Sequence, residues 1–503
     1  MLTARGHGTR VTLVHALRHA DGLRAVSAKT AGETVALLEY LLAVCYASTR
    51  CPTTRDEWLG WVRDGTPLTG AADWLDGRPD EHWDLFHPTE PLGQNALLAP
   101  YLDEHGAGPA QLVIEHAGDY NQFFDHHHLE HPTPLPADAA FRAMLTQHAY
   151  GPGGRARMPG KETLGPTLTN LAAGRLSTRI RVVALGTTLG DTLRLNLVPT
   201  AEDPGRFNRT WTVAPEPRRG FLTKPSGRRV DGPADLNTVL GRSILLRPTV
   251  TEDGTPAVDR VLMAAGELLE PLGHHRTQDA VYDGEGAGSA DAKPLRPSAT
   301  KALWREAHAL YAAVADRTHG PDLYDRLALL RGRRLSLWAV GLIAKQTTVV
   351  TWVSDTFPFV PGRERDMRYA AERGSLIADH VAAWLFKAAY VAWTVTYPNP
   401  KPGDKDRQIA RFDARPEHWA HTAEPFHTLL DETTAAGTEE RVDAALVAYA
   451  AELADCARRF LGNRLDSLPA NSRGMRARAQ AVRCLESGLT GRTAPDELKE
   501  DRE

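Results

Sequence analysis

The stretch TEERVDAALVAYAAELADCARRFLGNRL (residues 438–465) determines the architecture of the C-terminal part of the chain. Its apolar side chains recur at steps of three and four residues, which places them on one face of an α-helix. That face consists of Val442, Leu446, Tyr449, Leu453, Cys456 and Phe460. The segment is therefore predicted to be a long amphipathic helix that packs against other helices.

Three further segments near this stretch have the same periodicity. They are Met367–Val395, Pro416–Thr433 and Arg473–Leu489. The connections YPNPKPGDKD (397–406) and SLPANSRG (467–474) contain the Pro, Gly and Asn residues that end helices. Together these features predict a C-terminal four-helix bundle over residues 366–503.

The region before the bundle has a different, mixed character. A helix is predicted to begin near Thr30, and Gly and Pro interrupt most of the sequence that follows. Short strands are predicted at Gln111–Glu115, Arg179–Ala184, Thr192–Leu197 and Ser243–Pro248. The predicted fold class is α+β, with a large irregular mixed domain over residues 1–365 followed by the four-helix bundle.

Composition excludes several classes of protein. Of the 503 residues, 42% are apolar and 24% charged, which excludes a disordered or fibrous chain. The four cysteines form no CxxC pair, which disfavours a zinc ribbon or a redox motif. No apolar run reaches the ~20 residues that span a bilayer, and MLTARGHGTR at the N-terminus lacks an apolar signal segment. We therefore expect a cytoplasmic protein without a membrane partner.

Positive charge is concentrated locally, although the net charge is only −4. Residues 151–185 contain six basic side chains and one acidic side chain, and residues 206–247 contain nine basic and three acidic ones. Such an excess indicates a confined patch for a polyanion. It is equally typical of arginines scattered over solvated faces, and the sequence leaves both interpretations open.

The glycine-rich segment GPGGRARMPGKE (151–162) lies in the first of these stretches. It does not have the spacing of a Walker A loop, and Glu162 follows Lys161 where that loop needs Ser or Thr. Glycines allow backbone N–H groups to approach a nucleic-acid strand. We interpret the segment as a nucleic-acid contact in which Arg155, Arg157 and Lys161 bind phosphates, and a plain connecting loop is the alternative.

One cluster of potential metal ligands is present, in DHHHLEH (Asp125–His131). His127 and His131 have the helical spacing of zinc hydrolases, but no glutamate lies between them in the HExxH order. The sequence contains no GxSxG elbow and no convincing catalytic triad. A metal-dependent hydrolase is thus an alternative, while our principal expectation is a protein with no catalytic residue, no metal and no cofactor.

A hairpin is predicted where the apolar stretches LWAVGLIA (337–344) and VVTWV (349–353) flank Lys345-Gln346-Thr347. Its polar tip would be exposed.

Several blocks, in their order along the chain, resemble a known family. They include HWDLFHPTEPLGQN (82–95), AGDYNQFFDH (117–126), the glycine-rich segment and LWAVGLIAKQTTVVTW (337–352). The sequence resembles the CasA family, the large subunit of the type I-E CRISPR surveillance complex Cascade. Leu92 stands where the family pattern has Phe.

The resemblance implies a non-enzymatic, crRNA-guided function. Family members recognise the protospacer-adjacent motif (PAM) in double-stranded target DNA, promote duplex opening and R-loop formation, and recruit a helicase–nuclease. The implied partners are this DNA, the crRNA 5′ handle, the other Cascade subunits and the helicase–nuclease. A general RNA-binding scaffold is a further alternative.

The resemblance also assigns residues. It places a recognition loop near the crRNA 5′ handle at Tyr120, Asn121, Gln122 and Phe123, the glycine loop at Gly151, Gly153 and Gly154, and a wedge that blocks reannealing at Gln346. The family's lysine finger cannot be placed, since no lysine lies between Lys224 and Lys293, and Arg276 is only a weak substitute.

Overall fold

The computed structural model describes residues 1–116, 133–156, 158–160, 163–200, 203–211, 227–270, 272, 294–298, 303–307, 310–311, 323–345, 348–399 and 403–499. The chain divides into two compact units. The first comprises Met1–Leu303, Arg317–Arg331 and Leu335–Thr356, and the second comprises Trp304–Asp316, Gly332–Arg334 and Phe357–Glu503. The domain boundary predicted after residue 365 falls inside helix α13 (Glu364–Thr396).

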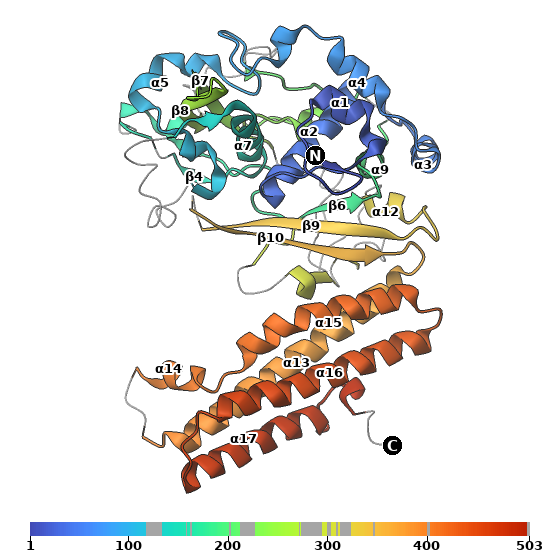
Figure 1. Cartoon of the computed structure of the whole chain (residues 1–503), viewed down its shortest axis with the longest axis vertical. Coiled ribbons are helices and arrows are strands. Elements are labelled where there is room, and N and C mark those ends of the chain that lie inside the picture. Colours follow the sequence, from blue (N-terminus) through green and yellow to red (C-terminus); the bar gives the residue numbers. More distant parts are fainter. Residues whose placement is uncertain are drawn as a thin grey trace. The chain divides into compact units, whose positions relative to one another are not determined.

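Helix α2 (Ala31–Ala47) forms the centre of the first unit (Figure 1, dark blue). It begins where the sequence predicted, because the Thr30 side chain accepts a hydrogen bond from the N–H of Glu33 at 3.2 Å. Every residue from Val35 to Tyr46 is buried, so this part of the helix has no solvent-facing side. A helix that is apolar all round belongs in the interior of a large core.

Shorter helices surround α2. They are α1 (Leu13–Arg18), α3 (Arg55–Asp64), α4 (Thr69–Asp76), α5 (Ala99–His105), α7 (Ala137–Tyr150), α8 (Pro166–Thr169), α9 (Leu189–Asn196), α10 (Pro233–Asn237) and α12 (Leu323–Leu327). Of these, α4, α7, α9 and α10 pack directly on α2.

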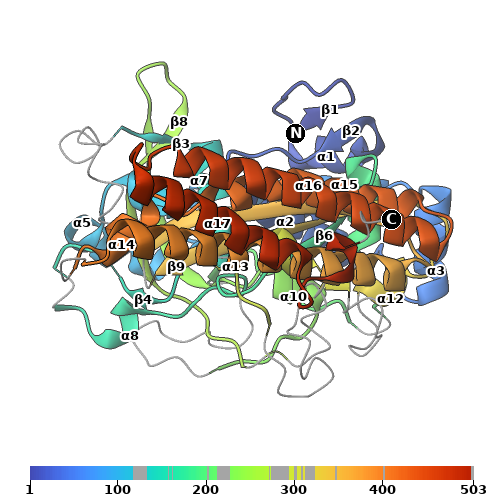
Figure 2. The same cartoon turned by 90° about the horizontal axis from the view of Figure 1, so that it is seen from below.

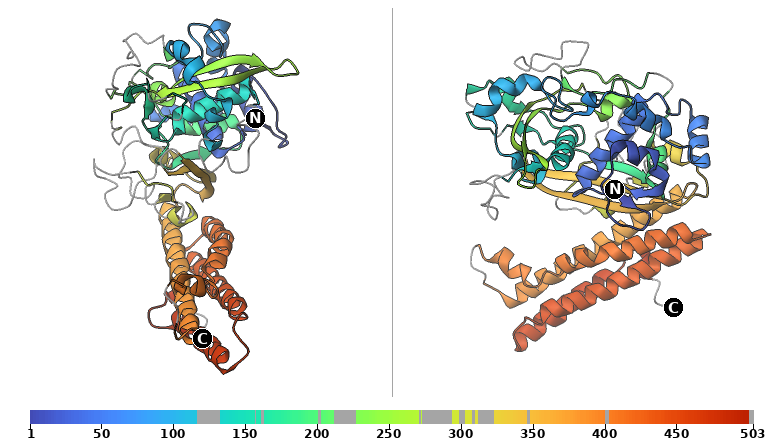
Figure 3. Two further views of the ribbon diagram at one scale, coloured as in Figure 1. Left: turned by 90° about the vertical axis from the view of Figure 1, so that its left-hand side faces the viewer. Right: turned by 45° about the horizontal axis from the view of Figure 1, so that its top comes forward.

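Two three-stranded sheets complete the first unit. One has the order β10–β9–β6, from β6 (Arg181–Leu185), β9 (Leu335–Lys345) and β10 (Thr348–Phe359). The other has the order β3–β8–β7, from β3 (Leu135–Pro136), β7 (Arg242–Val250) and β8 (Pro256–Ala265). Figure 3 shows β7 and β8 as a long green hairpin. Two small ribbons pair β1 (Leu2–Thr3) with β2 (Leu23–Ala25), and β4 (Gly154–Arg155) with β5 (Asn170–Leu171).

Long helices dominate the second unit (Figure 2, orange to red). They are α13, α15 (Arg415–Ala435), α16 (Glu439–Leu465) and α17 (Ser472–Thr490), with the short α14 (Lys405–Ala410) after α13. Helix α13 packs on α15, α16 and α17. All four predicted helices are confirmed, and in α16 the predicted apolar face is buried except for the half-buried Phe460. The mixed α+β composition is confirmed as well.

Two of the predicted strands are wrong. Residues 109–116 form 3₁₀ turns, and Thr192–Asn196 belongs to helix α9, whose C-cap is Leu197. In α9, Thr188 accepts a hydrogen bond from the Asp191 N–H at 3.1 Å, and Leu189, Leu193 and Leu197 recur at helical spacing on the buried side. The other two predicted strands correspond to β6 and β7.

Candidate nucleic-acid interface

The glycine-rich segment begins where helix α7 ends. The N–H of Gly151 donates to the carbonyl of Gln147 at 3.0 Å, and the chain then runs antiparallel to residues 169–174. Hydrogen bonds close this pairing at both ends, from Gly174 N to Gly151 O at 2.8 Å and from Ala156 N to Thr169 O at 2.7 Å. The segment is therefore one strand of a two-stranded ribbon, which we call the glycine ribbon (residues 151–156 and 169–174).

The predicted contact residues differ in their exposure along the glycine ribbon. Gly151 is buried, Gly153 is half-buried, and Gly154 and Arg155 are exposed. Gly154 has a φ of +149°, which side-chain-bearing residues rarely adopt. Arg157 and Lys161 lie outside the described residues. Gly154 and Arg155 are thus the predicted contacts that the described structure places at the surface.

A buried arginine lies beneath the glycine ribbon. Arg242, at the start of β7, has 1% of its surface exposed. Its guanidinium donates to the carbonyls of Pro152 (Nη2, 2.8 Å), Ala172 (Nη1, 2.6 Å) and its neighbour Gly241 (Nη1, 2.8 Å). It therefore bridges the two strands of the ribbon through one carbonyl from each.

The charge of Arg242 has no carboxylate partner among the described residues, where every ion pair involves other side chains. Burial lowers the pKa of its guanidinium to about 10, so the side chain is still a cation at neutral pH. Gly151 packs directly on it, because a Cβ at Gly151 would lie 2.5 Å from Nη2. The glycine at position 151 is thus explained by close packing inside the protein.

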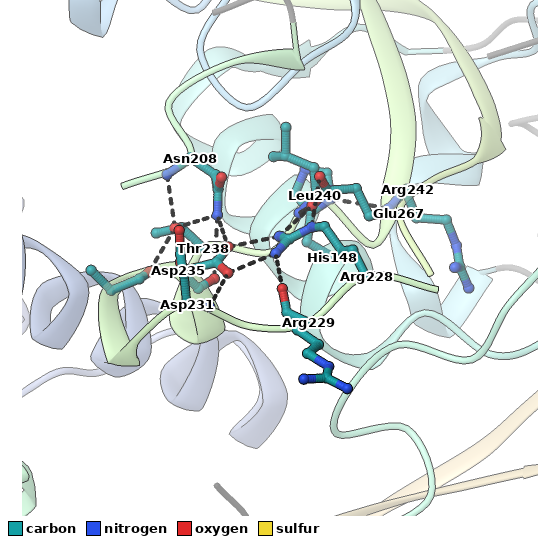
Figure 4. A network of polar contacts seen from close by, with 11 residues as sticks. His148, Asn208, Arg228, Arg229, Asp231, Asp235, Thr238, Leu240, Arg242 and Glu267 are labelled. Carbon is teal, nitrogen blue, oxygen red and sulfur yellow. Dashed lines mark hydrogen bonds and ion pairs between the residues drawn. The ribbon is translucent and has the colours of Figure 1, made fainter. Parts of the chain in front are cut away.

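His148 supports Arg242 from the last turn of α7. Its Nδ1 accepts a hydrogen bond from the Arg242 backbone N–H at 3.3 Å (Figure 4). This leaves Nε2 to donate to the Gly93 carbonyl at 2.9 Å. Burial, together with the nearby charge of Arg242, lowers the pKa of His148 to about 4. The imidazole is therefore neutral at physiological pH.

Residues 93–95 of the block HWDLFHPTEPLGQN also hold the strand that carries Arg242. The Gln94 side chain accepts from the Leu246 N–H at 2.8 Å, and the Asn95 amide donates to the Ser243 hydroxyl at 2.6 Å. This block therefore holds β7 in place through buried hydrogen bonds. Sequence reasoning missed Arg242 and His148. The available signal was an arginine that opens the apolar run ILL at 244–246.

Among the described residues, three other arginines of the two basic stretches form ion pairs with buried carboxylates. Arg175 and Arg181 are bound to the carboxylate of Glu39 on α2, with Arg181 Nε at 2.8 Å from Oε1. The side chains of all three are less than 8% exposed. Arg228 binds Asp235 at 2.6 Å and Glu267 at 2.9 Å, as Figure 4 shows. The interpretation of these stretches as a confined patch for a polyanion therefore does not apply to these three arginines, which are paired with buried carboxylates.

The predicted hairpin is present as β9 and β10, which are neighbours in one sheet. It is anchored by Trp352 of β10, whose Nε1 donates to Glu115 at 2.5 Å and whose ring meets that of Tyr150 edge-on at 4.8 Å. A Cβ at Gly32 would collide with this indole. Tyr150 directly precedes the glycine ribbon, so the ribbon and the hairpin share one anchor.

The remaining predicted site residues lie outside the described residues. These are Gln346 at the hairpin connection, the recognition loop at Asn121, Gln122 and Phe123, and the Asp125–His131 cluster. Within the described ranges, no group of three His, Cys, Asp or Glu side chains is arranged to hold a metal ion. None of the helices in those ranges is long and apolar enough to cross a bilayer.

These features define a large α+β protein with a braced glycine ribbon, a strand hairpin and a C-terminal helical unit. The family model for the CRISPR-associated protein Cse1 matches residues 1–460, and the chain belongs to this family. The resemblance inferred from the sequence is thereby confirmed.

Individual relatives agree with this assignment. The chain is 28% identical to CRISPR-associated protein CasA/Cse1 of Thermus thermophilus over 374 residues, which is 71% of this chain and 68% of the relative. The crystal structure of Thermobifida fusca Cse1 is similar with a TM-score of 0.72, at 20% identity, over 99% of this chain and 96% of that one. A chain of a CRISPR RNA-guided surveillance complex is similar with a TM-score of 0.70, at 19% identity, over 97% of both chains.

Proposed function

We propose that this chain is the large, non-catalytic subunit of a cytoplasmic type I-E Cascade complex. In this role it recognises the PAM in double-stranded target DNA, promotes R-loop formation and recruits the helicase–nuclease. Membership of the Cse1 family supports the proposal, as does the likeness of the fold to a chain of an RNA-guided surveillance complex. Base pairing with the crRNA would read the target sequence, while the protein reads a few flanking base pairs.

The glycine ribbon is the observation that carries the DNA-binding part of the proposal. It presents Gly154 and Arg155 to solvent, and its backbone is held rigidly from below by Arg242. A rigid, glycine-containing edge lets a nucleic-acid strand approach the backbone closely. In the proposal, Gly153 and Gly154 form this edge, Gly151 allows it to pack on Arg242, and Arg155, Arg157 and Lys161 bind phosphates.

The other elements receive the roles implied by the family. Asn121, Gln122 and Phe123 contact the crRNA 5′ handle, and Gln346 enters the duplex beside the first base pair. The helices α13, α15, α16 and α17 form a four-helix bundle over residues 366–503.

Substitution of Gly154 tests the DNA-binding proposal in the assembled complex. Gly154→Asp places a carboxylate on the exposed edge of the ribbon and should abolish most binding to a PAM-containing duplex. Gly165→Asp is the matched control, because Gly165 is exposed and a Cβ there would meet nothing within 4 Å. Equal affinity of the two variants for the duplex would contradict the proposal.

The hydrolase alternative is separated by a different measurement. Metal-dependent turnover of a nucleic acid by the isolated chain, abolished by His127→Ala, would favour the Asp125–His131 cluster over the recognition role.

A further inference from the structure

The hydrogen bonds of Arg242 fix the direction of two backbone N–H groups. In a trans peptide unit the carbonyl of one residue and the N–H of the next point in opposite directions, and the described chain contains no cis peptide bond. The carbonyls of Pro152 and Ala172 both point inward to Arg242. The N–H groups of Gly153 and Ala173 must therefore both point away from it, toward the outer side of the glycine ribbon.

These two donors are neighbours and have no partner within the described structure. The Ala173 nitrogen lies 3.2 Å from the position that a Cβ on Gly153 would occupy. Ala173 is exposed and Gly153 is half-buried. Among the described residues, neither N–H donates a hydrogen bond, although the flanking amides of Gly151, Gly174 and Ala156 all do. Adjacent N–H groups without a partner in the described chain can together bind an oxygen acceptor.

The charge beneath the donors favours an anionic acceptor. Arg242 is a buried cation whose partners in the described chain are neutral carbonyls, which satisfy its N–H groups without cancelling its charge. Its field therefore extends through the two peptide units to their outer N–H groups. Charge-assisted hydrogen bonds are about twice as strong as neutral ones, so an ionised oxygen gains more here than a base carbonyl would.

We propose that the N–H groups of Gly153 and Ala173 bind one phosphate oxygen of the target duplex. We call these two groups the Gly153–Ala173 donor pair. Arg242 is the positioning residue that turns both N–H groups outward. The proposal rests on the proposed function, and it adds a second donor and a buried support that the family resemblance did not assign. It also explains the glycine at position 153, since a methyl group there would cover the Ala173 N–H.

Single neutral methylphosphonates, scanned through the PAM region of both DNA strands, test the donor pair in the assembled complex. For wild type we expect one position at which neutralisation weakens binding about tenfold or more, as expected for hydrogen bonds to a charged group. Gly153→Ala should weaken binding of the unmodified duplex to a similar extent, and the methylphosphonate at that position should then have no further effect. Gly165→Ala is the control and should retain the complete wild-type profile.

The role of Arg242 is tested by Arg242→Lys, which keeps a positive charge but loses the fork that reaches both strands. We expect it to reproduce the Gly153→Ala profile, with loss of sensitivity at that phosphate alone. A general folding defect would instead lower affinity at every position and would overturn the positioning role. Gly153→Ala does not disturb the buried guanidinium, so the donor pair is tested even if the lysine variant does not fold.

Three results would overturn the proposal in distinguishable ways. Wild-type binding by Gly153→Ala, with Gly154→Asp impaired, would remove the donor pair and leave the proposed function intact. Wild-type binding by both variants would remove the proposed function as well. In the third result, Gly153→Ala removes the loss of binding that a 3-deazapurine causes, and leaves the loss that a methylphosphonate causes. The acceptor would then be a base edge in the minor groove, and the phosphate assignment would be wrong.

Discussion

The Glu39 site and the Arg242 site both bury guanidinium groups in the N-terminal unit, but only the first also buries a carboxylate. At the Glu39 site, Arg175 and Arg181 close around one carboxylate of the central helix α2. At the Arg242 site, the guanidinium faces backbone carbonyls of an exposed ribbon. The Glu39 site is a buried ion-pair cluster that contributes to folding alone. A buried cation that has no carboxylate partner among the described residues and lies behind a surface can also act on a ligand.

The largest effect is expected from breaking the Glu39 site. Glu39→Gln would leave two buried arginines without their shared carboxylate, and losing one partner of a buried ion pair costs about 3–5 kcal/mol. Urea unfolding of the purified chain should detect this loss. Glu81→Gln, at an exposed position of the same unit, is the control and should unfold like wild type. A Glu39→Gln chain of wild-type stability would mean that the carboxylate does not compensate the arginines.

The pH dependence of stability sharpens the description of the Arg242 site. The folded-state pKa of His148 is about 4, below its ordinary value of 6.5, so the unfolded chain binds the extra proton first as the pH falls. His148 therefore favours folding above pH 6.5, and this contribution is lost as the pH falls from 6.5 to 4. The loss amounts to about 3 kcal/mol.

Measurement of the unfolding free energy at several pH values checks this sign. His148→Gln should flatten the dependence between pH 4 and 6.5. His418, on α15, is buried in the other unit and also has a pKa of about 4, lowered mainly by burial. His418→Gln should flatten the dependence similarly without changing DNA binding by the ribbon. An unchanged slope for His148→Gln would show that folding does not lower the pKa of His148.

A smaller effect is expected from substitution of Gln346 in the hairpin. This substitution distinguishes opening of the DNA duplex from initial binding of the duplex. A wedge beside the first base pair must offset a stacking loss of ~1–2 kcal/mol. Gln346→Ala should therefore slow R-loop formation on linear duplex roughly tenfold, with initial PAM binding nearly unchanged. Stopped-flow kinetics on a target whose first pairs are mismatched should show little slowing. Equal slowing on both targets would mean that Gln346 is not a wedge.

Elements with a strong local period could be predicted from the sequence, and contacts between distant residues could not. The helices at 31–47 and 439–465 follow from their apolar spacing and, for the first, from the Thr30 cap. The segment 192–197 was misread because its alternating leucines suit a strand until the Thr188 cap is recognised.

The candidate site shows the same limit. The glycine-rich segment was identified from its composition, and its ribbon partner was not. Counting charges could not show that Arg175 is neutralised by Glu39, which lies 136 positions away. Nor could it place Arg242 beneath Pro152, 90 positions away. Such pairings depend on how α2, α7 and β7 pack, which no local pattern encodes.

The salt dependence of DNA binding tests the central claim, that the glycine ribbon is a DNA-contacting surface, most directly. The measurement compares the assembled wild-type complex with one that carries Arg155→Ala, Arg157→Ala and Lys161→Ala together. The slope of log K against log salt should fall by about one unit for each lost phosphate contact, or about three in all. Unchanged affinity and an unchanged slope would mean that the ribbon is only a structural connection.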